Sequence, residues 1–197
     1  MKAMHLTDFG LDHLAVIDTS EPGEPASGEV LVKFAAAAVN PRDSQIIAGQ
    51  FTPNVEFPLI PLSDGAGEVV AVGPEVKRVA VGDLVTPLFF PNWFSGEALG
   101  AERAVSSGLE APGVMRELAI YNEAAVVPAA THLSAAEAAC LPCASLTAWT
   151  ALVEKSGIGA GDCVLIQGTG GVAIAALQLV KALGAQAIVI SSSDEKL

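Results

Sequence analysis

The fold of this chain is decided by Cys163-Val164-Leu165-Ile166-Gln167-Gly168-Thr169-Gly170-Gly171-Val172-Ala173. Residues 163–167 form a largely apolar run that stops at glycine, which is typical of a central parallel strand. Apolar residues at helical spacing follow over residues 171–183, and Gly184 comes where such a helix would end. Residues 187–190 form another short apolar run. The stretch and its continuation therefore predict one β-α-β unit.

The glycine-rich turn over residues 168–173 has the pattern G-x-G-x-x-A. The first glycine permits a tight turn, the second lets the backbone approach a pyrophosphate, and the small third residue permits close helix packing. The helix start also offers unpaired amides and a partial positive charge. We expect this turn to bind the diphosphate of a dinucleotide, and a turn that serves packing alone is the less favoured alternative. The expected binding residues are Gly168, Thr169, Gly170, Gly171 and Val172.

The end of the second predicted strand indicates which dinucleotide binds. An acidic residue there would hold the ribose hydroxyls of NAD, whereas this chain has Ser191-Ser192-Ser193. Hydroxyl groups accept a 2′-phosphate that an aspartate would repel, and Lys196 adds positive charge. NADPH is therefore the expected cofactor, with NADH as the alternative, and Ser191, Ser192 and Lys196 are expected at the 2′-phosphate. A plain polar loop is the other interpretation of this segment.

The first 130 residues have a different pattern, with short β-type runs separated by turn sequences. The expected strands cover residues 2–6, 13–18, 29–39, 65–72 and 83–90. Strands at this density predict a barrel or sandwich. Residues 92–113 lack periodicity and are expected to form a long surface loop. Ser134 and Glu137 have capping-box spacing, and a further helix is expected at about residues 145–156, before Gly157.

The composition limits the classes of function. The chain has 10 basic and 22 acidic side chains and a net charge of −12, a field that repels nucleic acid and anionic lipid. We therefore expect neither nucleic acid nor membrane as a partner. Three cysteines without disulfide-framework spacing favour a cytoplasmic location. Cys140 and Cys143 lie in an alanine-rich apolar stretch, so we interpret them as buried thiols rather than redox or metal residues.

Taken in order, these parts resemble the medium-chain dehydrogenase/reductase family, and within it the zinc-independent quinone oxidoreductase-like branch. The matching segments are residues 28–33, 39–43, 65–70, 81–85, 141–149 and the loop at Gly168. The resemblance implies an α/β protein with a β-rich GroES-like catalytic domain, residues 1–130, followed by a doubly wound Rossmann domain, residues 131–197. A Rossmann sheet normally has two halves, and this segment has room for two strands. We therefore expect an incomplete Rossmann domain that needs a missing C-terminal half or a complementary chain, with a homo-oligomer as a further expectation.

The resemblance also implies positions for the reaction site. Zinc members of the family hold the metal with a Cys, a His and a Cys or Asp, and the matching positions here are Asn40, Ser63 and Cys143. Two of these are poor zinc ligands, so no zinc is expected. By the same resemblance, Asn40 lies near the nicotinamide or substrate, Asp43 supports its loop and Thr147 faces the nicotinamide. The plainer interpretations are turn chemistry, helix N-terminal pairing and a hydroxyl satisfied within its own helix, respectively.

Without zinc to polarise a carbonyl, the simplest chemistry is hydride transfer from the cofactor to a conjugated acceptor. The expected function is therefore that of an NADPH-preferring oxidoreductase acting on a quinone or an α,β-unsaturated carbonyl. Two alternatives stay open: an alcohol dehydrogenase-like activity on alcohols or aldehydes, and a non-catalytic nucleotide-binding or crystallin-like structural protein. Trp93 and Phe94 either line a substrate cleft or pack beneath their own loop.

Overall fold

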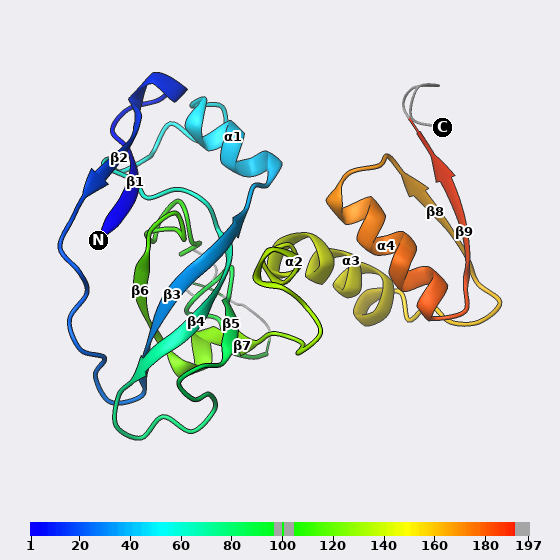
Figure 1. Cartoon of the computed structure of the whole chain (residues 1–197). Helices are drawn as coiled ribbons and strands as arrows, with labels where there is room; N and C mark the ends of the chain where they lie inside the picture. The colour runs from blue at the N-terminus through cyan, green and yellow to red at the C-terminus, as the bar shows by residue number, and fades with distance from the viewer. Residues whose placement is uncertain (97–99, 101–104, 192–197) are drawn as a thin grey trace. The chain divides into compact units, whose positions relative to one another are not determined.

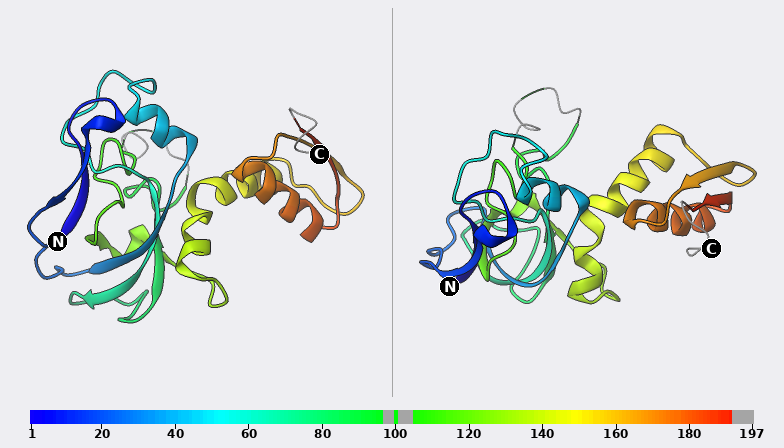
Figure 2. Two further views of the ribbon diagram at one scale, coloured as in Figure 1. Left: turned by 45° about the horizontal axis from the view of Figure 1, so that its top comes forward. Right: turned by 90° about the horizontal axis from the view of Figure 1, so that it is seen from above.

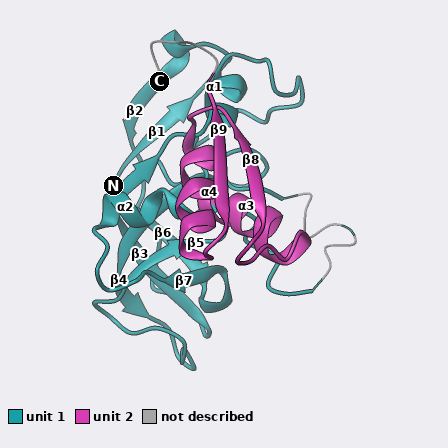
Figure 3. Cartoon of the chain, turned by 90° about the vertical axis from the view of Figure 1, so that its right-hand side faces the viewer, with its two compact units in different colours: residues 1–142 teal, residues 143–197 magenta. Residues whose placement is uncertain are grey.

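The computed structural model describes residues 1–96, 100 and 105–191 (Figures 1 and 2). Contacts divide the chain into two compact units, Met1–Pro142 and Cys143–Leu197, which Figure 3 distinguishes by colour. A boundary between compact units does not show where a domain folds independently. The expected domain boundary after residue 130 therefore stays a prediction, and each unit is described by itself.

The first unit is built on a five-stranded antiparallel sheet with the strand order β6-β3-β4-β5-β7. Its strands are β3 (Glu29–Ala38), β4 (Asp64–Val72), β5 (Leu84–Pro87), β6 (Leu118–Asn122) and β7 (Val126–Pro128). Register shifts after Leu31 and after Phe34 interrupt the long β3–β4 pair, and such bulges bend strands. Figure 2 shows the curved course of these strands. The expected β-rich GroES-like fold is confirmed.

The core of the sheet consists largely of valines. In β3 the buried Val30 and Val32 flank the half-buried Leu31, and the exposed Lys33 follows. β-branched side chains pack well on a pleated surface that is covered on one side. The valines with 0% exposure in this cluster are Val30, Val32, Val69, Val85 and Val126. The alternation along β3 therefore places one face of the sheet in the core.

Smaller elements complete the first unit. β1 (Lys2–Leu6) pairs antiparallel with β2 (Leu14–Asp18), and η1 (Leu11–His13) lies between them. α1 (Pro41–Ile47) follows β3, and η3 (Glu123–Ala125) joins β6 to β7. Leu6 and Ile46 belong to one buried cluster, together with Leu59 and Leu109. Through this cluster α1 packs against β1.

The predicted capping box begins α2 (Ala135–Ala139). The amide and hydroxyl of Ser134 donate to the Glu137 carboxylate at 2.8 and 2.7 Å, and the Glu137 amide donates to the Ser134 hydroxyl at 3.3 Å. Ala138 and Ala139 are buried in a cluster with Ala66 of β4. Their small side chains allow the helix to lie close to the strand.

The second unit contains the predicted β-α-β arrangement. β8 (Cys163–Gln167) and β9 (Gln186–Ile190) are parallel neighbours, and α4 (Gly171–Ala182) connects them. The helical segments before β8 are η4 (Leu141–Ser145), α3 (Leu146–Trp149) and η5 (Thr150–Lys155), of which η4 and η5 are π-helical. They end before Gly157, whose φ of 61° suits the predicted glycine stop. Over the described residues, no helix combines the length and apolarity needed to cross a bilayer.

Two sequence-based interpretations need correction. The expected surface loop is buried in part, because Ser106, Ser107 and Leu109 are each at most 8% exposed. The Ser106 hydroxyl accepts from Arg42 and donates to Glu110, so this polar side chain has partners in the interior. Of the two thiols expected to be buried, Cys143 is half-buried and Cys140 is exposed. It follows the last residue of α2, and its thiol donates to the carbonyl of Ala136 at 3.4 Å.

Candidate functional site: a glycine-rich loop and a buried Asn-Asp pair

The glycine-rich loop joins β8 to α4. Gly168 follows directly after β8, and its amide donates to the carbonyl of Ile190 at 2.8 Å. Thr169 is exposed, and Gly170 is the N-cap of α4. The first amides of any α-helix have no partner within the helix, and here they belong to Gly171 and Val172. The loop therefore has the strand-to-helix backbone arrangement that is typical of phosphate-binding sites.

Gly168 and Gly170 are glycines for different reasons. Gly168 has a φ of 89°, a conformation in which any other side chain is strained. Gly170 has φ −79° and ψ 178°, which every residue type adopts. A Cβ atom at Gly170 would meet nothing within 4 Å. Neither backbone conformation nor packing in the described residues requires a glycine there, whereas close approach of a ligand to the backbone would.

The following residues pack the helix onto the second unit. A Cβ atom at Gly171 would lie 3.3 Å from the Cβ of Ala144, so this position allows close packing. Ala173 is half-buried against the core that contains Ala148 and Ile166. Val172 stays 43% exposed beside the loop. The small residues of the motif thus serve both packing and access to the backbone.

Ser191, the one described residue of those expected at the 2′-phosphate, follows the same edge of the strand pair as the loop. Gln167 and Ile190 are direct partners in the parallel pair, so the residues after them, Gly168 and Ser191, leave the same edge. Ser191 is half-buried. Ser192 and Lys196 lie outside the described residues, so their contact with a phosphate stays a prediction.

Asn40 and Asp43 form a connected pair at the start of α1. The Asn40 amide donates to Asp43 Oδ2 at 2.8 Å, and the Asp43 amide donates to the Asn40 carbonyl at 2.9 Å. This is the helix N-terminal arrangement that the plainer interpretation of Asp43 predicts. The side-chain atoms Asn40 Nδ2 and Asp43 Oδ1 are buried and have no hydrogen-bond partner in the described chain. One donor and one acceptor are therefore left for a further group.

The Asp43 carboxyl is an unusual acid because it is only 1% exposed. Burial raises its pKa above the ordinary value, and the nearby Asp64 charge acts in the same direction. The Asn40 amide and the Arg42 charge oppose this shift without cancelling it. Asp43 is thus a buried carboxyl with a raised pKa beside a buried amide donor.

Two of the three positions that match zinc ligands, Asn40 and Ser63, carry other chemistry, and only Cys143 keeps a ligand type. Ser63 is fully buried, and its hydroxyl donates to Asp64 Oδ1 at 2.8 Å. Asn40 presents an amide, which is a poor zinc ligand. Over the part of the chain that the structure describes, no three or more His, Cys, Asp or Glu side chains gather as a metal site would require. Thr147, the remaining expected site residue, is exposed on α3.

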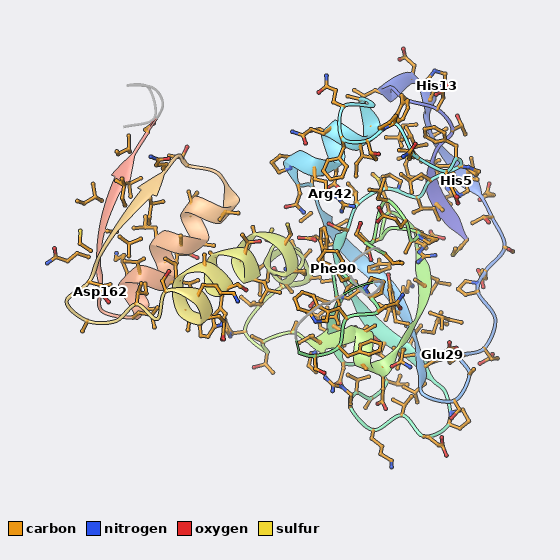
Figure 4. The ribbon with its side chains drawn as sticks, turned by 180° about the vertical axis from the view of Figure 1, so that it is seen from behind. His5, His13, Glu29, Arg42, Phe90 and Asp162 are labelled. Carbon is orange, nitrogen blue, oxygen red and sulfur yellow. The ribbon has the colours of Figure 1, made fainter. Side chains whose placement is uncertain are left out.

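Arg42 organises a cluster that the sequence interpretation missed. Its guanidinium donates to the Ser106 hydroxyl at 2.6 Å and to the Ser107 carbonyl at 3.2 Å. The same group lies over the rings of Phe89 and Phe51, 4.8 and 5.4 Å from their centroids. Figure 4 labels Arg42 at the start of α1 and Phe90, which follows β5. The only sequence signal was a basic residue inside the Asn-Pro-Arg-Asp segment.

The two aromatic residues of the loop after β5 differ in their surroundings. Trp93 packs against Phe90 with ring centroids 6.0 Å apart, and its Nε1 donates to the Gly96 carbonyl at 3.0 Å. Phe94 is 54% exposed and lines a cavity within the first unit. Trp93 therefore packs within its own loop, whereas Phe94 lines the cavity.

Comparison with known proteins gives consistent relatives. The alcohol dehydrogenase GroES-like domain family matches residues 26–137. A zinc-type alcohol dehydrogenase-like protein of Schizosaccharomyces pombe is 39% identical over 190 residues, which is 95% of this chain and 55% of that protein. A chloroplastic quinone-oxidoreductase homolog of Spinacia oleracea is 34% identical and covers 91% of this chain and 53% of its own length.

Solved structures agree with the sequence relatives. A Sinorhizobium meliloti 1021 protein assigned as an alcohol dehydrogenase has a TM-score of 0.90 and 39% identity, covering 99% of this chain and 58% of that one. The chain thus spans about half the length of the relatives that it matches. The family match, the GroES-like sheet and the glycine-rich loop before α4 agree. This chain belongs to the medium-chain dehydrogenase/reductase family.

Proposed function

We propose that this chain acts in an NADPH-dependent oxidoreductase that transfers hydride to a quinone or an α,β-unsaturated carbonyl. The nucleotide-binding part of this proposal rests on Gly170. Its backbone has ordinary angles and its missing side chain faces open space. A dinucleotide whose diphosphate approaches this backbone accounts for a glycine that the chain itself does not need. Gly168, Thr169, Gly171 and Val172 complete the proposed diphosphate contacts.

The preference for NADPH rests on the edge of the strand pair that the loop shares with Ser191. A serine there offers a hydroxyl to a 2′-phosphate and no opposing charge. We assign Ser192 and Lys196 to the same phosphate on the sequence alone. NADH is the alternative cofactor, and Ser191→Asp discriminates between them. This substitution should weaken NADPH binding through like-charge opposition and leave NADH binding intact or improved.

The substrate side of the proposal rests on Asn40. Bound NADPH would supply the hydride, and a conjugated acceptor spreads the incoming charge over its own atoms. We assign to the buried Asn40 Nδ2, which lacks a partner in the described chain, the role of donor to the acceptor oxygen. Asp43 positions Asn40 through the 2.8 Å bond to its amide. Thr147 is assigned to the nicotinamide by family resemblance.

The proposed reaction does not use zinc, because Asn40 and Ser63 occupy two of the ligand positions. The Ser63 hydroxyl is already engaged with Asp64 at 2.8 Å. The rival is an alcohol dehydrogenase-like reaction on alcohols or aldehydes, for which zinc would polarise the oxygen. We expect purified protein incubated with zinc and then desalted to retain far less than one zinc ion per chain by elemental analysis. Stoichiometric zinc would favour the rival.

The partners of the proposed enzyme are small molecules and further protein. Leu165 and Ile188 of the β8–β9 pair are 55% and 54% exposed, and Ile190 is 50% exposed. We propose that a further chain segment, a complementary chain or a second copy covers these side chains, since large exposed apolar surfaces mark interfaces. A cytoplasmic location, supported by the odd number of cysteines, belongs to the same proposal.

The test of the nucleotide site is a pair of matched glycine substitutions. Gly170→Leu places a side chain in the space that the diphosphate would occupy. Gly159→Leu is the control, because a Cβ there also meets nothing within 4 Å and Gly159 is not among the positive-φ glycines. We expect NADPH affinity, measured by fluorescence titration, to fall at least about tenfold in the first variant only. Equal affinity in both variants would overturn the assignment.

Catalysis is tested separately in a preparation that includes the proposed partner of the β8–β9 pair. A panel of quinones, enones and simple alcohols distinguishes the proposed reaction from the alcohol dehydrogenase-like rival. We expect Asn40→Ala to lower kcat/KM for the enone by about tenfold or more, because a donor to the acceptor oxygen is lost. Good NADPH binding without turnover of any acceptor would instead support the non-catalytic alternative.

A further inference from the structure

Asn40 and Ser63 belong to two segments that leave the sheet at the same end of one strand pair. Ala38, the last residue of β3, pairs with Asp64, the first residue of β4. Asn40 comes two residues after Ala38, and Ser63 comes directly before Asp64. The two segments therefore start from one place in the sheet, and what holds them beyond it depends on contacts with other parts of the first unit.

The 106–114 loop is bonded to the second of these segments. The amide of Val114 donates to the carbonyl of Leu62 at 2.9 Å. A Cβ atom at Gly113 would collide with the same carbonyl, so this glycine lets the two backbones touch. Leu62 directly precedes Ser63 in the chain. The loop is therefore fixed next to one side of the proposed substrate site.

Arg42, which Figure 4 labels, joins the same loop to the first turn of α1. Its guanidinium donates to Ser106 Oγ at 2.6 Å and to the Ser107 carbonyl at 3.2 Å. The Ser106 hydroxyl in turn donates to Glu110 Oε2 at 2.6 Å, so one hydroxyl links a cation to a carboxylate. Hydrogen bonds to charged groups are stronger than neutral ones. The planar guanidinium makes both loop contacts at once, which the single nitrogen of a lysine does not match.

Arg42 also lies within the turn that joins Asn40 to Asp43. The Asn40 amide donates to Asp43 Oδ2 at 2.8 Å across this turn. Burial raises the pKa of Asp43, whereas the Asn40 amide and the Arg42 charge lower it. The guanidinium thus acts on the Asn40–Asp43 pair as well as on the loop. Because α1 has only seven residues, its position depends on such tertiary contacts.

We propose that Arg42 is a positioning residue, which holds Asn40 in place by fixing the first turn of α1 to the 106–114 loop. This inference rests on the proposed function, in which Asn40 donates to the acceptor oxygen. Displacing a reacting group by about 1 Å can lower a rate about a hundredfold. Since Arg42 acts through Asn40, its loss lowers kcat and leaves NADPH affinity in place.

The first test is a double-mutant cycle between Arg42 and Asn40, in the same preparation that serves for catalysis. Arg42→Met removes the guanidinium, and Arg42→Lys keeps the charge with a single donor nitrogen. Arg78→Met is the control, because it removes the charge of an exposed arginine in the same unit. We expect Arg42→Met to lower kcat for the enone about tenfold or more, with NADPH affinity within about twofold of the parent. Arg42→Lys should restore part of this loss, and Arg78→Met should keep the parent kcat.

The double variant shows whether Arg42 acts through Asn40. In the Asn40→Ala background we expect Arg42→Met to lower kcat by no more than about twofold, because residues that act as a unit are not additive. If the parent has no turnover, or if Asn40→Ala keeps the parent kcat, the proposed substrate role fails and this inference fails with it. If Asn40→Ala lowers kcat and Arg42→Met does not, or if the two losses multiply, only this inference fails.

A second measurement needs no turnover and uses the 197-residue chain. Ser106→Ala removes the hydroxyl between Arg42 and Glu110 and leaves both charges in the chain. Ser27→Ala is the matched control, because the exposed Ser27 also donates to a glutamate, Glu75, at 2.8 Å. Thermal unfolding verifies that each variant is folded, and two-dimensional NMR records the backbone amide signals.

We expect the amide signals of Asn40 and Asp43 to shift in Ser106→Ala, because these amides report the geometry of the turn that Arg42 holds. The amide signals of β8 should stay at their parent positions, which distinguishes this effect from general loosening of the chain. Ser27→Ala should shift neither group of signals. Unshifted Asn40 and Asp43 amides in Ser106→Ala would overturn the proposal, even if Arg42→Met does not fold.

Discussion

Asp43 combines almost complete burial with a carboxylate oxygen that has no partner, so it makes stability depend on pH. Its folded-state pKa lies above the ordinary value of 3.8. The folded chain therefore holds the proton to higher pH than the unfolded chain does. The stabilisation from protonation is present at low pH and is lost as pH rises through the folded-state pKa.

We predict that Asp43→Asn removes this dependence. Relative to the variant, the parent chain should gain free energy of unfolding as pH falls from about 7 to 4. Urea denaturation of both proteins at several pH values measures the difference, and Asp162→Asn, at an exposed position, is the control. A constant difference, or one that shrinks on acidification, would contradict the assigned direction of the Asp43 pKa.

Tyr121 gives a second prediction at the residue scale. Its buried hydroxyl has no well-aligned hydrogen bond in the described chain; burial raises its pKa, and the charge of the neighbouring Arg116 and a hydrogen bond to Arg116 lower it. Removing an unsatisfied buried polar group is neutral or stabilising, so Tyr121→Phe should change the free energy of unfolding by between zero and about +1 kcal/mol. Denaturant unfolding of the parent and the variant measures this change. Destabilisation by more than about 1 kcal/mol would show that the hydroxyl has a structural partner.

Elements in this chain depend on local signals to different degrees. Ser134 accepts and donates within the capping box of α2, so Ser134→Ala should lower the free energy of unfolding by about 1 kcal/mol. Ser156→Ala, at an exposed serine outside a capping box, is the control. Equal stability of the two variants in urea would show that packing of Ala138 and Ala139 alone holds α2.

The loop between β8 and α4 gives a contrasting pair of glycines. Gly168→Ala should destabilise the chain by about 1 kcal/mol or more, because its φ of 89° strains any other residue. Gly170→Ala should leave stability unchanged, because its backbone angles are ordinary and its surroundings are open. Thermal unfolding distinguishes the two. A similar loss in both would mean that Gly170 also serves the fold.

An element could be predicted from the sequence where neighbouring residues determine it, and it could not where residues far apart in the chain do. The β-α-β unit and the α2 capping box were predicted because apolar spacing and caps act within a few residues. β6 was missed because it is defined by pairing with β3, as in Glu29 with Asn122, far apart in the chain. A helix start at α1 was only the plainer interpretation of Asp43, because Asn40-Pro41 also suits a turn, and the burial of Ile46 decides for a helix.

The same reasoning separates the parts of the candidate site. Gly168 and Gly170 were predictable because a motif places them between a strand and a helix. The Arg42 cluster was not, because its partners Phe89 and Ser106 come from a distant loop.

At the scale of the whole molecule, the main feature is that large apolar side chains on the β8–β9 pair are exposed. We predict that the 197-residue chain self-associates at micromolar concentration, as exposed apolar strands promote. Ile188→Lys, at a position that is 54% exposed, should reduce this association in sedimentation velocity. Val81→Lys, at a 59% exposed valine of the first unit, is the control. Equal effects of both substitutions would point to general charge rather than to this surface.

The first strand has a consequence for how this protein is made. The outer edge of β1 pairs with residues near position 117: Met4 donates to the carbonyl of Met115, and the Glu117 amide donates to that of Lys2. The partner is 115 residues away, so it leaves the ribosome many seconds after β1, at synthesis rates of about 5–20 residues per second. Until then the nascent chain exposes this edge to chaperones and to neighbouring chains. The first unit therefore closes only many seconds after β1 has been synthesised.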